Sequence, residues 1–233
     1  MKLLAIETAT EACSVAVHVD GRVIERFQVA PRRHAELTLP WAGQLLAEAG
    51  IARSALDAVA ISRGPGAFTG VRLAIAIAQG IALAIDRPLL ALSTLAVLAE
   101  RAPAGADRVL AAIDARMGEV YAGRFVRGAD GQLQAEGSER VCAPQAVQVP
   151  GQGWQGVGTG FAAADGALPA GLGDALAGHD AQALPHAADL ARLALAAWQR
   201  GEAIAPELVE PAYLRDNVAL TIAEQQALRE SRR

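Results

Sequence analysis

The chain has 233 residues and a net charge of −4, and 52% of its residues are hydrophobic while only 4% are aromatic. That length and composition allow one large or two small domains packed mainly by aliphatic side chains. The only adjacent basic pairs that stand out are Arg32-Arg33 and Arg232-Arg233, which excludes strong autonomous binding to nucleic acid.

The remaining bulk features point to a cytoplasmic protein. Cys13 and Cys142 are far apart in the sequence and show no metal-ligand spacing, so we expect reduced thiols. The first residues enter an apolar strand without a signal-peptide pattern. The apolar stretch at residues 73–85 is too short for a convincing membrane span, and no membrane association is expected.

The first three elements are predicted to be strands of an antiparallel meander. Residues 2–6 are apolar, residues 13–19 alternate, and residues 23–29 return after Asp20-Gly21. An Asp-Gly pair between alternating segments is a strong signal for a two-residue hairpin.

Residues 34–49 are predicted to form a helix that Pro40 either kinks or delays. Its apolar residues recur at helical spacing and would share one face. These residues are Leu37, Trp41, Leu45 and Leu46.

A strand, a glycine turn and a long helix follow. Residues 56–61 are apolar, and residues 64–66 read Gly-Pro-Gly, a turn because proline fixes φ and glycine adopts angles that other residues avoid. A helix is predicted over residues 69–86, with Thr69 as its N-cap.

Residues 71–85 also alternate with the period of a strand, but their length and alanine content favour a helix. Two stripes of small side chains then lie beside each other, with members four residues apart. Small side chains let another backbone approach closely. That backbone can belong to the same domain or to another subunit, and the two interpretations are compatible because a helix can use one face for each contact. The stripes are the Gly80 stripe (Ala76, Gly80, Ala84) and the Ala74 stripe (Ala74, Ala78, Ala82).

The first half closes with a strand at residues 89–92 and a helix capped by Ser93 or Thr94 that reaches Arg101. Three antiparallel strands followed by alternating helices and strands is the element order of the ribonuclease H-like half-domain, from which actin-like (ASKHA) α/β proteins are built. We expect this half to span residues 1–103.

A second, degenerate copy of the half-domain is expected over residues 104–233. Strands are predicted at residues 109–113 and 119–126, with a weaker one near Leu133. Periodicity is weak through residues 128–180. Helices are predicted at residues 184–200 and 218–230, and the terminal helix could pack back on the first half.

Five blocks of sequence together resemble the bacterial TsaB (YeaZ) family, and they span nearly the whole chain. The Gly-Pro-Gly-x-Phe-Thr-Gly-x-Arg block is highly specific. The blocks are LAIETAT (4–10, followed by CSVAV), RHAE (33–36), RGPGAFTGVR (63–72), DARMGEVY (114–121) and PAYLR (211–215).

This resemblance implies a non-catalytic partner of TsaD that works with the ATPase TsaE to form threonylcarbamoyladenosine in tRNA. It implies a heterodimer with a TsaD-like paralogue, a homodimer when alone, contact with tRNA only through the complex, and no cofactor. The implied interface lies on the helices at residues 34–49 and 69–86. The candidate contacts are His34, Leu37, Arg72, Ala76 and Gly80.

TsaD itself has a similar fold, but its metal site is not expected here. TsaD-like proteins carry a His-x-x-x-His pair after the strand that follows the long helix, where this chain has Thr94 and Leu98. Leucine cannot ligate a metal and threonine is a poor substitute. A metallopeptidase, a third functional class, is disfavoured for the same reason.

The alternative function is an actin-like ATPase or small-molecule kinase. Glu7 and Thr8 stand where such proteins place an acid and a hydroxyl near phosphate, and Gly64 and Gly66 belong to a turn that opens a helix. A polar turn and a packing turn are the simpler interpretations. The only candidate for the adenine side is the GVGTG segment at 156–160.

Two further groups have a structural and a catalytic interpretation. Asp114, Arg116 and Glu119 form either an acid–base cluster or ion pairs that fix a hairpin, and the hairpin is favoured. His34 is either a general base or a capping or interface histidine, and the second is favoured. No residue is assigned a catalytic role.

Overall fold

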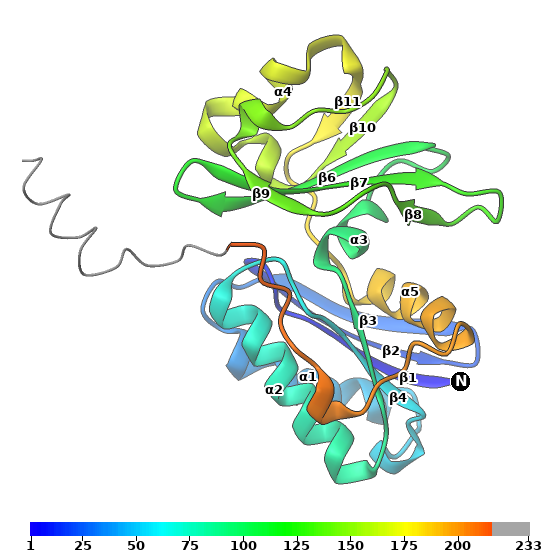
Figure 1. Ribbon diagram of the computed structural model, residues 1–233. Helices are drawn as coiled ribbons and strands as arrows, with labels where there is room; N and C mark the ends of the chain where they lie inside the picture. The colour runs from blue at the N-terminus through cyan, green and yellow to red at the C-terminus, as the bar shows by residue number, and fades with distance from the viewer. Residues whose placement is uncertain (216–233) are drawn as a thin grey trace, which may run out of the picture.

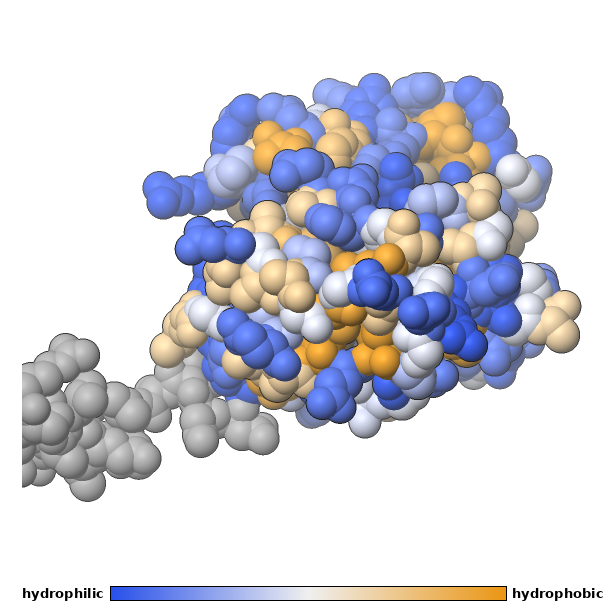
Figure 2. All heavy atoms as spheres, turned by 90° about the horizontal axis from the view of Figure 1, so that it is seen from above, coloured by the Kyte–Doolittle hydropathy of each residue, from blue (hydrophilic) through white to orange (hydrophobic). Residues whose placement is uncertain are grey.

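The structure is a computed structural model that describes residues 1–215. It contains two mixed sheets, one above the other in Figure 1, with helices on their faces. This arrangement confirms the predicted α/β class. Viewed from above, hydrophilic side chains surround separate hydrophobic patches (Figure 2).

The first sheet has five strands in the order β3-β2-β1-β4-β5. β1 pairs antiparallel with β2 and parallel with β4, which confirms the predicted meander. Asp20 and Gly21 have φ of 49° and 89°, the left-handed angles that a tight hairpin turn needs. The strands are β1 (Lys2–Glu7), β2 (Ala12–Val19), β3 (Arg22–Val29), β4 (Ala58–Ser62) and β5 (Leu89–Leu92).

Alternate side chains of β1 face two different apolar layers. Leu4 and Ile6 join a core with α1 (His34–Glu48) and α2 (Phe68–Ile85), whereas Leu3 and Ala5 pack with α5 (Ala187–Gln199). The sheet is therefore covered on both faces, which explains why β1 is apolar from Leu3 to Ile6.

α2 separates the two stripes of small residues. The side chains of the Ala74 stripe are fully buried, whereas Ala76, Gly80 and Ala84 are exposed. The 18-residue helix is also long and apolar enough to cross a membrane, but buried core helices pass the same test, and its buried stripe packs under the first sheet. The prediction that Thr69 caps this helix was wrong: the N-cap is Ala67, without a side-chain cap bond.

The second sheet repeats the strand order of the first. Its order is β11-β10-β6-β7-β8, with β9 also pairing with β7. The central β6 pairs antiparallel with β7 and parallel with β10, as β1 does with β2 and β4. The strands are β6 (Arg108–Arg116), β7 (Glu119–Arg127), β8 (Leu133–Ala135), β9 (Arg140–Cys142), β10 (Trp154–Val157) and β11 (Leu176–Asp180).

The helices of the second half are reduced. Where the first half has α1 and α2, the second has short 3-10 helices and α4 (Ala167–Leu172). The GVGTG segment packs tightly against β6, since a Cβ at Gly158 would lie 2.3 Å from the Ala112 carbonyl oxygen. The 3-10 helices of the second half are η2 (Pro144–Ala146), η3 (Thr159–Phe161), η4 (Ala163–Gly166), η5 (Gly173–Ala175) and η6 (Pro206–Leu208), and the first half has η1 (Arg53–Ala55).

The two halves exchange their trailing helices. α3 (Thr94–Ala99) follows the first sheet but packs on the second, and Ser93 caps it as predicted. α5 follows the second sheet but packs on the first. The division into residues 1–103 and 104–233 remains a prediction, and the predicted helix at 218–230 lies outside the described residues.

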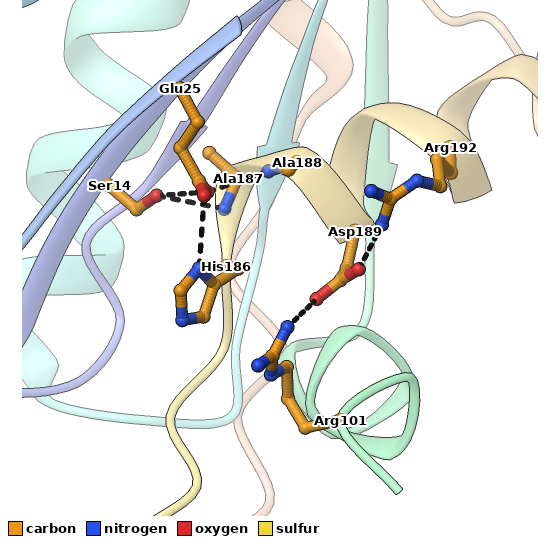
Figure 3. A network of polar contacts seen from close by, with 8 residues as sticks. All are labelled: Ser14, Glu25, Arg101, His186, Ala187, Ala188, Asp189 and Arg192. Atoms are coloured by element: carbon orange, nitrogen blue, oxygen red, sulfur yellow. Dashed lines mark hydrogen bonds and ion pairs between the residues drawn. The ribbon is translucent and has the colours of Figure 1, made fainter. Parts of the chain in front are cut away.

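A polar network anchors the start of α5 to the first sheet (Figure 3). Glu25 on β3 accepts hydrogen bonds from the Ala188 amide (2.9 Å), from the Ser14 hydroxyl (2.7 Å) and from His186 Nδ1 (3.0 Å). Ser14 in turn accepts from the Ala187 amide (3.0 Å). These side chains cap the helix, since two of its free amides find partners on β2 and β3.

The surroundings of Glu25 favour its charged form. Burial alone would raise the pKa of its carboxyl, but the bonds from His186, the Ala188 amide and Ser14 together lower that pKa. On the other side of α5, buried Asp189 pairs with Arg101 and Arg192 (Figure 3). The start of α5 is thus held by β2 and β3 on one side and by Arg101, which follows α3, on the other.

We predict that Glu25→Ala lowers the free energy of unfolding by about 1–3 kcal/mol, because it leaves the α5 amide and Ser14 without their acceptor. Urea denaturation measures this loss. Glu48→Ala, which removes an exposed ion pair with Arg26, should change the value by less than about 1 kcal/mol. Equal effects of the two changes would show that the network does not anchor α5.

Candidate functional site

A cleft of about 830 Å³ opens between the two sheets. Both halves contribute to its walls, and residues 211–215, which we call the C-terminal segment, pass along it. The lining segments are the β1–β2 loop, the stretch around Arg32 between β3 and α1, the glycine turn with the first residues of α2, the β6–β7 hairpin with Thr159, and residues 211–215.

Glu7, next to the floor of the cleft, is a fully buried carboxyl. One carboxylate oxygen accepts from the Ala9 amide (2.7 Å) and the other accepts from Ser62. Burial raises the pKa of Glu7 from 4.5 to about 7, although both hydrogen bonds oppose the shift. The neighbouring Thr8 is also buried, and its hydroxyl donates to the Gly70 carbonyl (2.8 Å).

The glycine turn is pressed against the β1–β2 loop. A Cβ at Gly66 would lie 2.3 Å from the Ala9 carbonyl oxygen, and one at Gly70 would lie 2.0 Å from the Thr8 carbonyl oxygen. The Ala67 amide donates to Ala9 (2.7 Å). Only glycine permits this approach, because any side chain would displace the backbone opposite.

The structure therefore brings together the four residues of the nucleotide-binding hypothesis. Glu7 and Thr8 use their polar atoms within the protein. Gly64, at φ 107°, faces Ala212 of the C-terminal segment, and Gly66 faces the β1–β2 loop. Nucleotide binding at these residues remains a prediction.

Three of the remaining candidates have clear structural roles. His34 Nε2 lies 2.9 Å and 3.1 Å from the carbonyl oxygens of Thr10 and Ala12. That nitrogen must carry a proton to serve two acceptors, so it cannot act as a base in this state. Asp114 pairs with Arg116 (2.9 Å) and accepts a hydrogen bond from its amide (2.8 Å), which confirms the hairpin interpretation for these two residues. Glu119 pairs instead with Arg215 outside the hairpin.

The position after β5 that corresponds to the metal-ligand pair is closed to solvent. Thr94 and Leu98, which stand where a TsaD-like metal site would be, are fully buried. Within residues 1–215 no group of three or more His, Cys, Asp and Glu side chains is placed to hold a metal ion.

An exposed apolar surface lies on the outer side of the two long helices. We call it the α1–α2 face. Gly80 has no atom within 4 Å of the position of a Cβ, and nor does Gly43 on α1. Leu37, another predicted contact, is half-buried and lies on a different side of α1 from Leu39, because residues two apart in a helix point in nearly opposite directions. The face consists of Leu39 and Gly43 on α1 and of Ala76, Gly80, Leu83 and Ala84 on α2.

Sequence reasoning missed the bulky members of this surface and of the cleft. Leu39 and Leu83 are 52% and 60% exposed, and an apolar side chain out of phase with the buried stripe was the signal that could have identified them. Tyr213 reaches the start of α2 from a segment 141 residues away, and no local pattern announces that contact.

Comparison with known proteins places the chain among tRNA-modification proteins. The family model described as "TsaD: tRNA N6-adenosine threonylcarbamoyltransferase" matches residues 27–223. The tRNA threonylcarbamoyladenosine biosynthesis protein TsaB of Escherichia coli (strain K12) is 43% identical over 231 residues, covering 94% of this chain and 96% of the relative. The protein of the same name from Haemophilus influenzae is 39% identical, covering 94% and 95%.

A solved structure shares the fold of this chain. The structure titled "YeaZ from Pseudomonas aeruginosa" superposes with a TM-score of 0.82 at 48% identity, covering 91% of this chain and 99% of that one. The match extends over both sheets, so the second, reduced half belongs to the shared fold.

The buried carboxyl makes a testable contribution to stability. Because the folded-state pKa of Glu7 is above its unfolded value, its contribution is fully present below pH 4.5 and is lost as the pH rises through about 7. Glu7→Gln mimics the protonated acid. We expect the variant to be more stable than the wild type at pH 8, by up to about 3 kcal/mol.

Urea unfolding at several pH values between about 4.5 and 8 measures this difference. Glu11→Gln on the same loop serves as the control and should keep the wild-type pH profile. A Glu7→Gln profile parallel to that of the wild type would contradict the assignment of this pH dependence to Glu7.

Proposed function

Because this chain belongs to the TsaB (YeaZ) family, whose members take part in tRNA threonylcarbamoyladenosine biosynthesis, we propose that it is the non-catalytic scaffold subunit of the modifying complex. It pairs with a TsaD-like paralogue and works with a TsaE-like ATPase in the cytoplasm. It meets tRNA only within that complex.

The observation that carries this proposal is the α1–α2 face. From Leu73 to Ile85 the helix α2 has no charged side chain, yet Ala76, Gly80 and Leu83 are exposed. Depletion of charge at the centre of a surface is typical of protein interfaces. Small residues in the Gly80 stripe let a partner helix approach to the lower end of the usual 8–10 Å spacing.

The same face suits self-association of the isolated chain. A two-fold symmetric contact brings one surface patch against its own copy. A paralogue with the same fold presents an equivalent pair of helices, so it competes for this surface. We therefore propose a homodimer when the chain is alone and a heterodimer in the complex, with His34 and Arg72 at the cleft end of the interface.

The cleft does not support catalysis by the isolated chain. Glu7 is fully buried, and its oxygens are engaged by Ala9 and Ser62. The Thr8 hydroxyl is engaged by Gly70. The groups that an ATPase or a kinase would direct at phosphate therefore stabilise the packing of the glycine turn, and we propose no turnover by this chain alone.

The interface is tested by enlarging its small residues. Ala76→Trp and Gly80→Leu should each weaken binding to the TsaD-like protein of the same organism by about tenfold or more, because one bulky side chain separates the whole surface. Neither melting temperature should fall appreciably, since both positions face open space. Titration calorimetry and thermal melts measure the two effects.

Gly171→Leu provides a matched control, because Gly171 is also a helical glycine with no atom within 4 Å of a Cβ. It should leave partner binding unchanged. Normal binding by well-folded Ala76→Trp and Gly80→Leu would place the interface elsewhere. A large fall in their melting temperatures would assign the Gly80 stripe to the core.

A further inference from the structure

Arg72, which we place at the cleft end of the interface, also makes a stack with two aromatic rings that the fold does not explain. The Arg72 guanidinium lies 3.2 Å from the centre of the Phe68 ring and 5.1 Å from the centre of the Tyr213 ring. It also donates to the Phe68 carbonyl (3.3 Å) and to the Tyr213 hydroxyl. We call these three residues the Arg72 stack.

The rings of the stack remain open to solvent. Phe68 is 62% exposed and Tyr213 is 56% exposed, in a chain with few aromatic residues. Tyr213 is held in place because the Ala212 amide donates to the Arg63 carbonyl (2.8 Å). Two aromatic rings are thus fixed at the cleft mouth with more than half of each residue exposed.

The cleft is lined by more arginines than carboxylates, whereas the whole chain has a net charge of −4. Among the described residues, Arg32 and Arg72 have no carboxylate within ion-pair distance, and both line the cleft. Arg116 lies on the opposite wall with 84% of its side chain exposed and pairs with Asp114. Glu11 also lines the cleft, and Arg215 is offset by Glu119.

Exposed aromatic rings beside arginine side chains match the chemistry of single-stranded nucleic acid. Bases stack on Phe and Tyr faces, and arginines bind the phosphates between them. We propose that the mouth of the cleft binds unpaired nucleotides of an RNA loop, with bases on Phe68 and Tyr213 and phosphates at Arg32, Arg72 and Arg116. This inference rests on the proposed function, in which the complex acts on tRNA.

Two features favour an RNA strand over a free nucleotide. The cations come from both halves, Arg32 after β3 and Arg116 on the β6–β7 hairpin, so they suit several phosphates along a backbone. The stacking surfaces lie at the rim and not in an enclosed pocket. With so few phosphate contacts the isolated chain binds RNA weakly, and the surface acts when a partner supplies the rest of the site.

The test uses the full chain reconstituted with its TsaD-like partner, and a fluorescent RNA hairpin with an unpaired loop as the probe. Phe68→Ala, Tyr213→Ala and Arg72→Ala should each raise the Kd for the hairpin, by about 5- to 150-fold for the loss of one stacked base. Tyr213→Phe should stay near the wild type, because stacking needs only the ring. Arg22→Ala, at the far end of β3, should change the Kd by less than about twofold.

Size-exclusion chromatography of each complex separates this inference from the proposed function. Failure of the wild-type pair to associate would refute both. Intact complexes whose hairpin affinities all match the wild type would overturn the inference alone. Two other results would also overturn it. Loss of the complex with both Phe68→Ala and Tyr213→Ala would make the rings a protein contact. Loss of ATP binding by these variants with hairpin binding unchanged would make the stack a nucleotide site.

Discussion

The close approach of the glycine turn to the β1–β2 loop is the constraint on which the rest of the structure depends. Gly66 and Gly70 bring two backbones together at a distance that excludes any Cβ. The contact is reinforced by the bond from the Ala67 amide to Ala9 and by that from Thr8 to the Gly70 carbonyl. The position and rotation of α2 on the sheet are set at this point.

The rotation of α2 then determines what each stripe does. The Ala74 stripe faces the sheet, where small side chains let the helix lie close to the strands, and the Gly80 stripe is left on the outside. The same turn also places Phe68 and Arg72 at the cleft mouth. A single close contact thus creates both an apolar surface for a protein and a cationic, aromatic rim.

Local signals in the sequence predicted the local features correctly. Asp20-Gly21 marks a hairpin because its angles suit few other pairs, and Ser93 marks a helix start because its hydroxyl accepts the Leu95 amide. Thr69 looked like a cap for the same reason, but α2 begins at Phe68 with Ala67 as its N-cap, and the Ala67 amide donates to Ala9 of the β1–β2 loop. Features made by distant segments, such as the position of Tyr213 and the exchange of α3 and α5 between sheets, had no local signal.

Amide hydrogen exchange of the chain alone and with its TsaD-like partner tests the central claim, that the α1–α2 face is the partner surface. A helix covered by a partner opens less often, so its amides exchange more slowly. We predict slower exchange in His34–Glu48 and Phe68–Ile85 on addition of the partner, with α5 and the outer strands of the second sheet unchanged. Slower exchange confined to α5 or to the second sheet would contradict the account.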